Sequence, residues 1–113
     1  MLNTLVRAYH ALPLGLLRPA LRAAAGKLTA GQKKIVRTDN GVLYELELDE
    51  FIDREIYMHG CFEPDTARAI QHFVKPGMAV FDVGAKFGAH ACLFAKLVGA
   101  QGKVIAFAGL NAR

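Results

Sequence analysis

An aspartate and two glycines follow a nearly continuous apolar run in the second half of the chain. Asp82, Gly84 and Gly88 are spaced as Asp-x-Gly-x-x-x-Gly, and the apolar run covers residues 78–83. Gly84 carries no side chain where a ligand would approach the backbone, and Gly88 lets the next helix begin close to the strand. A dinucleotide-binding loop would read Gly-x-Gly-x-x-Gly, but Lys86 replaces its middle glycine. A carboxylate at this place suits a cationic ligand better than a pyrophosphate.

Two apolar segments and a helical pattern surround this loop. Residues 78–83 and 103–108 are apolar runs typical of parallel strands that are covered on both faces. Between them lies an amphipathic helical pattern, ended by Gly99, with apolar positions at Ala91, Leu93, Phe94, Leu97 and Val98. The order predicts one βαβ unit, in which a ligand binds beyond the carboxyl ends of the strands. Asp82 stands at that end.

A β-hairpin is predicted upstream. Residues 35–38 and 42–48 flank Asn40-Gly41, a pair that supplies the positive φ angles of a tight two-residue turn. Along residues 42–48 apolar and polar side chains alternate, which is typical of a half-buried strand.

Two helices are predicted between the hairpin and the βαβ unit. We expect Asp49 to cap a short helix that ends at Gly60, and Pro64 to open the next helix. The first helix would carry the apolar residues Phe51, Ile52, Ile56 and Tyr57. The apolar face of the second would comprise Ala67, Ile70, Phe73 and Val74.

The basic character of the chain belongs to its N-terminal arm. Residues 1–38 hold seven basic side chains and no acidic one, whereas residues 39–113 hold seven basic and ten acidic ones. Apolar residues recur at helical spacing in the arm, and two prolines interrupt the pattern, so we expect two short helical pieces. The apolar positions are Leu2, Leu5, Tyr9, Leu12 and Leu16. The arm would pack on the body of a larger protein, or residues 1–22 would contact a membrane surface; nucleic-acid binding is not expected, because the bases are dispersed.

Other reactive side chains suggest no second site. His59-Gly60-Cys61 and His90-Ala91-Cys92 are donors that zinc accepts, but residues two apart on a helix point to different sides. We therefore expect no metal, and we expect both cysteines to be small buried apolar residues. The absence of serine excludes serine nucleophiles. Two cysteines do not make a disulfide scaffold, so a cytoplasmic setting is expected.

These patterns predict an α/β chain in three parts. Residues 1–32 form the helical arm, residues 33–60 the hairpin and a short helix, and residues 61–113 a helix and the βαβ unit. The wider sequence resembles the FkbM-type methyltransferases, a class I family that depends on S-adenosylmethionine. The segments that carry this resemblance are Ile56 to Pro64, Val80 to Ala85 and Gly102 to Phe107.

The resemblance implies a partial Rossmann-like fold and a cofactor site. Asp82 and the backbone of the Gly84 loop, with its residues Ala85, Lys86 and Gly88, would hold the methionine part of S-adenosylmethionine. A segment with His59 and Glu63 would border the same site. The acceptor would be a hydroxyl group of a small molecule or a glycan.

The chain departs from the family at three places. The family usually has asparagine where Lys86 stands, and a lysine could reach the cofactor carboxylate or repel its sulfonium. Ala108 stands where an acid would accept hydrogen bonds from the ribose. The sequence ends at Arg113, after only two strands of a seven-stranded sheet.

These departures make activity of this chain alone unexpected, and they leave three hypotheses. The chain is a methyltransferase fragment, a non-catalytic remnant that contacts a membrane surface or a protein, or, least favoured by Lys86, a nicotinamide-dependent enzyme. Few elements remain to cover the two apolar strands, so we also expect self-association.

Overall fold

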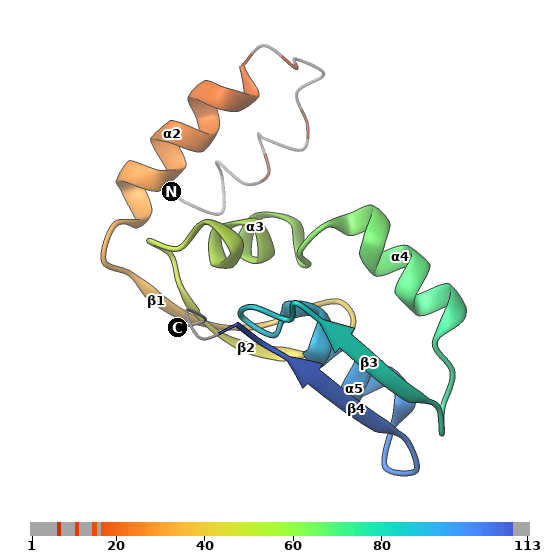
Figure 1. Cartoon of the computed structure of the whole chain (residues 1–113). Helices are drawn as coiled ribbons and strands as arrows, with labels where there is room; N and C mark the ends of the chain where they lie inside the picture. The colour runs from red at the N-terminus through yellow and green to blue at the C-terminus, as the bar shows by residue number, and fades with distance from the viewer. Residues whose placement is uncertain (1–6, 8–10, 12–14, 16, 110–113) are drawn as a thin grey trace.

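The computed structural model describes residues 7, 11, 15 and 17–109, and it shows a mixed α/β chain (Figure 1). Two separate two-stranded sheets are present in this part of the chain, one antiparallel and one parallel. The elements in order are α2 (Arg18–Thr29), β1 (Lys33–Arg37), β2 (Leu43–Glu47), α3 (Phe51–His59), α4 (Pro64–Phe73), β3 (Ala79–Val83), α5 (Ala89–Val98) and β4 (Lys103–Phe107).

Strands β1 and β2 form the predicted hairpin, but its turn is longer than the two-residue turn expected. The Thr38 N–H donates to the Val42 carbonyl at 2.9 Å, which leaves three residues in the loop. The Gly41 N–H donates to the Thr38 carbonyl at 2.8 Å, and Gly41 alone in the loop has a positive φ, 76°. This is a turn closed by a left-handed glycine, so Asn40 needs no positive φ.

The hairpin and α3 share the best-buried core of the described chain. Leu46, Leu48 and Ile56 are 1%, 0% and 2% exposed and pack together, as the alternation along β2 predicts. The α3 side chain Asp53 is also buried, and its Oδ2 accepts a hydrogen bond from the Glu47 N–H at 2.8 Å. A buried carboxylate therefore holds β2 against α3.

The helix α3 ends at the predicted residue but begins without the predicted cap. Gly60 ends it with a φ of 74°, as expected. Its N-cap residue is Glu50, without a side-chain cap, so the prediction for Asp49 is wrong. The Asp49 carboxylate instead accepts the Gly31 N–H at 3.0 Å, which ties the end of the hairpin to the segment that follows α2.

Helix α2 packs on this hairpin unit through its last turns. Ala25 packs against Met58 of α3, and the Thr29 hydroxyl lies 3.4 Å from the Leu48 carbonyl oxygen, to which it donates. Pro19 lies in the first turn of α2, where proline is tolerated. The predicted stripe from Leu2 to Leu16 and the first helical piece fall outside the described residues, apart from isolated positions. Within the described ranges, every helix is too short or too polar to cross a bilayer.

Helices α4 and α5 pack on each other through the buried residues Ala67, Ile70 and Leu93. Two expectations for this region are wrong. Phe73 is 71% exposed, because none of the described elements covers the last turn of α4. Cys92 is exposed on α5 and is not a buried apolar residue, whereas Cys61 is partly buried against the α4–α5 core.

Strands β3 and β4 pair in parallel, and α5 connects them along the chain, which is the predicted βαβ order. The register runs from Ala79 opposite Lys103 to Val83 opposite Phe107. In Figure 1, α5 lies behind the pair, and the side towards the viewer carries no described helix. The open side exposes Phe81, Val83, Ile105 and Phe107, at 64%, 82%, 38% and 52%. One face of the pair is therefore uncovered in the described chain, which agrees with the expectation that few elements remain to cover these two apolar strands.

Candidate functional site

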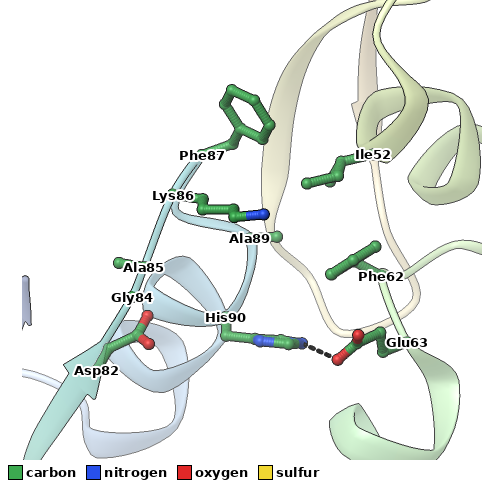
Figure 2. Close-up of a pocket in the computed structure, with 10 residues that line it drawn as sticks. All are labelled: Ile52, Phe62, Glu63, Asp82, Gly84, Ala85, Lys86, Phe87, Ala89 and His90. Atoms are coloured by element: carbon green, nitrogen blue, oxygen red, sulfur yellow. Dashed lines mark ion pairs between the residues drawn. The ribbon is translucent and has the colours of Figure 1, made fainter. Parts of the chain in front are cut away.

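A cavity of about 260 Å³ lies beyond the carboxyl end of β3, beside the first turn of α5 (Figure 2). Its walls come from four places: the end of β3, the loop after it, the start of α5, and the segment between α3 and α4 together with α3 itself. The lining residues are Ile52, Phe62, Glu63, Asp82, Gly84, Ala85, Lys86, Phe87, Ala89 and His90. This is the end of a βαβ unit at which ligands bind.

Asp82 brings a carboxylate to this cavity from β3. The alternation of the strand places Val83 on the open face of the sheet and Asp82 on the opposite side. The Asp82 Oδ2 atom is buried, and no described residue donates a hydrogen bond to it. An unsatisfied buried acceptor costs about 1–3 kcal/mol, and more if it is charged, so this Asp82 oxygen is unfavourable for folding unless it gains a hydrogen-bond donor.

The loop after β3 is held in shape by its backbone. The Gly84 and Ala85 N–H groups both donate to the Phe107 carbonyl, at 2.9 and 3.1 Å, which joins the loop to the end of β4. Gly84 and Gly88 have φ angles of 82° and 79°. A Cβ atom at Gly88 would meet nothing within 4 Å. The left-handed backbone, and not the close packing expected from the sequence, therefore requires glycine at position 88.

Lys86 has a left-handed backbone without being a glycine, at a φ of 45°. Its side chain extends from the loop over the cavity in Figure 2. Across the described ranges, the Lys86 ammonium group forms no ion pair. Among the described residues, Glu63 is the other non-glycine residue with a positive φ, at 49°. Left-handed backbone at non-glycine residues costs about 1–3 kcal/mol and concentrates at functional sites, and both of these described residues line this cavity.

Glu63 and His90 meet on another wall of the cavity. The distance from Glu63 Oε2 to His90 Nε2 is 3.8 Å, and the His90 ring lies 5.6 Å from the Phe62 ring. The Nε2 atom of His90 is buried without a hydrogen bond to any described residue. The sequence pattern singled out His90 only as a weak zinc donor. The one signal in the sequence that could have placed His90 at the cavity is its position directly after the glycine loop, in the first turn of the next helix.

Tyr44 fixes the first turn of α5 to the hairpin. Its hydroxyl donates to the Ala89 carbonyl at 2.9 Å, and Ala89 also packs against the hairpin core. Burial raises the pKa of Tyr44 to about 12, because the ionised phenolate is poorly solvated there. Burial likewise raises the pKa of the neighbouring Cys61 thiol, which makes it a poor nucleophile. Sequence reasoning found no role for Tyr44 beyond strand alternation.

The cavity brings together most of the predicted site residues. Asp82, Gly84, Ala85, Lys86 and Glu63 line it, and Gly88 lies in the same loop.

His59 does not line the cavity. It lies in the last turn of α3, with its Nε2 atom 3.5 Å from Glu55 Oε2. Among the described residues, no group of three or more histidine, cysteine or acidic side chains could hold a metal ion.

Comparison of the chain with protein-family models, with curated proteins and with solved structures found no match.

Proposed function

We propose that the chain binds S-adenosylmethionine as part of an FkbM-type methyltransferase that methylates a hydroxyl group of a small molecule or a glycan. The observation that carries this proposal is the Asp82 carboxylate, which lines the cavity beyond β3 and accepts no hydrogen bond from any described residue. A carboxylate in that place favours a cation. S-adenosylmethionine offers an ammonium and a sulfonium group.

The loop geometry also supports a cofactor of this kind. Gly84 and Gly88 give the chain a sharp passage from β3 to α5, and Gly84 leaves the loop backbone open to the cavity side. The exposed Ala108 follows β4 directly, at the place where an acid would accept hydrogen bonds from the ribose hydroxyls. We therefore expect weak cofactor binding by the unmodified chain, with most of the contact at the amino-acid end.

The test is titration calorimetry with S-adenosylmethionine on the unmodified chain and on its Ala108→Glu variant. A hydrogen bond to a charged group is worth about 1.5–3 kcal/mol, so the variant should bind about tenfold to hundredfold more tightly. The Ala108→Leu variant, which adds bulk without an acceptor, is the matched control. Absence of a saturable heat with both the chain and the Ala108→Glu variant would contradict the proposal.

A second candidate function is a non-catalytic interaction module in the cytoplasm or at a membrane surface. The observation that favours it is the open face of the β3–β4 pair, where Phe81 and Val83 are mostly exposed. This function needs no ligand in the cavity. Calorimetry separates the two, because an interaction module gives no heat with the cofactor and no response to Ala108→Glu.

A further inference from the structure

The cavity holds two unpaired groups of opposite charge. Asp82 contributes a carboxylate without a hydrogen-bond donor at the end of β3, and Lys86 contributes an ammonium group without an ion pair among the described side chains. Figure 2 shows the two side chains on different sides of the cavity, with the loop backbone at Gly84 and Ala85 between them. The Asp82 carboxylate and the Lys86 ammonium group do not pair with each other, because they point to different parts of the cavity.

A ligand that satisfies both groups carries a cation and an anion a short way apart. An α-amino acid has this arrangement, with an ammonium group for Asp82 and a carboxylate for Lys86. A purely cationic ligand would leave Lys86 unpaired and would be repelled by it. A purely anionic ligand would meet the Asp82 carboxylate.

The size and the walls of the cavity favour a ligand as small as one amino acid. Its volume of about 260 Å³ lies below the ~300–1,000 Å³ of sites that take larger cofactors. Phe62, Phe87 and Ile52 give the cavity an apolar side that suits an unbranched aliphatic or thioether side chain.

We propose that this cavity binds a zwitterionic α-amino acid of about the size of methionine, free as well as attached to a nucleoside, and that Lys86 determines this specificity by pairing with the α-carboxylate. The inference rests on the proposed function for the end of the cofactor that enters the cavity, and it adds that this end is sufficient for binding. Lys86 thus acts on the carboxylate of the ligand and not against its cation, because the cation lies on the Asp82 side.

The experiment deletes one charge at a time from the ligand and from the protein. The ligands are L-methionine, S-adenosylmethionine and two analogues of methionine. One analogue is the amine that lacks the α-carboxylate, and the other is the acid that lacks the α-amino group. The proteins are the unmodified full chain, Lys86→Gln, Asp82→Asn, and Lys75→Gln as a control at an exposed lysine outside the cavity. Binding is followed by titration of the amide NMR signals, which also show whether each variant keeps its fold.

For the unmodified chain, loss of either ligand charge should weaken binding about tenfold. In Lys86→Gln, methionine should bind about tenfold more weakly, and removal of the ligand carboxylate should have no further effect. In Asp82→Asn, methionine should also bind about tenfold more weakly, and removal of the ligand amino group should have no further effect. Lys75→Gln should behave as the unmodified chain does.

The outcomes separate this inference from the proposed function. Binding of S-adenosylmethionine without binding of methionine, or equal binding of methionine and its carboxylate-free amine by the unmodified chain, overturns the inference and leaves the proposed function standing. Binding of methionine without S-adenosylmethionine overturns the proposed function and, with it, the part of the inference that the amino acid binds when attached to a nucleoside; the role of Lys86 is then supported for the free amino acid alone. If the unmodified chain binds neither ligand, both the inference and the proposed function are overturned. This outcome needs no variant protein.

Discussion

The two sheets of this chain have the same size but differ in how they are covered. Each has two strands of five residues and a helix packed against one side. In the hairpin unit, Leu46 and Leu48 are almost completely buried against Ile56 of α3. In the parallel pair, Phe81 and Val83 are mostly exposed.

This difference separates the part that stabilises the chain from the part that carries the site. The hairpin closes on itself over a short loop and packs on the helix that follows, so its core is made from neighbouring residues. The parallel pair positions Asp82 and the glycine loop through backbone hydrogen bonds, while its apolar outer face has no described partner. Substitutions in the two regions should therefore have different effects.

The largest effect is expected in the hairpin core. Leu48→Ala removes a side chain that is 0% exposed, and it should lower the free energy of unfolding by about 2–5 kcal/mol. Val83→Ala, on the open face of β3, should change it by less than about 0.5 kcal/mol. Urea unfolding followed by circular dichroism measures both. Equal losses for the two variants would refute the contrast between the sheets.

The connection between α5 and β4 should be the next most sensitive position. A Cβ atom at Gly102 would lie 2.3 Å from the Val98 Cβ atom and 2.7 Å from the Val98 carbonyl oxygen. Gly102→Ala should therefore cost about 1–3 kcal/mol, because helix and strand must move apart. Gly109→Ala is the control, since a Cβ atom there meets nothing within 4 Å. A harmless Gly102→Ala would mean that the helix and strand are not this close.

Tyr44 joins the two regions, and its removal should have a smaller, pH-dependent effect. Tyr44→Phe loses the hydrogen bond to the Ala89 carbonyl, which is worth about 0.5–1.5 kcal/mol at neutral pH. The folded pKa of about 12 lies above the ordinary value of 10.0, so folding favours the neutral phenol. This contribution is fully present below pH 10 and is lost as the pH rises towards 12.

Thermal unfolding of the unmodified chain and of Tyr44→Phe between pH 8 and pH 12 tests this account. The difference in stability between the two proteins should shrink above pH 10. A constant difference over the whole range would show that the Tyr44 hydroxyl is not held in a desolvated place.

The smallest effect on stability, with a clear effect on assembly, is expected at the open face. Phe81 is 64% exposed and stacks on Phe107 at 6.2 Å, so Phe81→Thr should change the unfolding free energy by less than about 0.5 kcal/mol. The same change should reduce self-association, because it breaks the apolar surface. Size-exclusion chromatography with light scattering at several concentrations measures this. A monomeric unmodified chain at all concentrations would contradict the expected self-association.

Periodicity in the sequence predicts most of the local structure, and its errors have physical causes. The alternation along residues 42–48 and the helical spacing after Gly88 correspond to β2 and α5. The predicted length of the hairpin turn is wrong because Asn40-Gly41 suits both a two-residue and a three-residue loop. Packing between the two strands decides which loop forms. Phe73 lies at the correct helical spacing, but no described element stands opposite it.

The sequence predicts the loop that contributes to the candidate site, but not the residues from other segments that line the cavity. Asp82 and Gly84 are adjacent in sequence to the strand and helix that place them, so the motif alone predicts their positions. The contacts of His90 with Glu63 and of Tyr44 with Ala89 join distant segments, and only tertiary packing creates them. His59 is next to Gly60 in sequence, but the helix α3 directs it towards Glu55.

The most direct test of the proposed cofactor site is to map the amide NMR signals that S-adenosylmethionine shifts in the full chain. The shifts should concentrate at Gly84, Ala85, Lys86 and His90 around the cavity, and the hairpin-core signals of Leu46 and Leu48 should stay unchanged. Shifts confined to the open face of the β3–β4 pair, or no shifts at saturating cofactor, would contradict the proposed site.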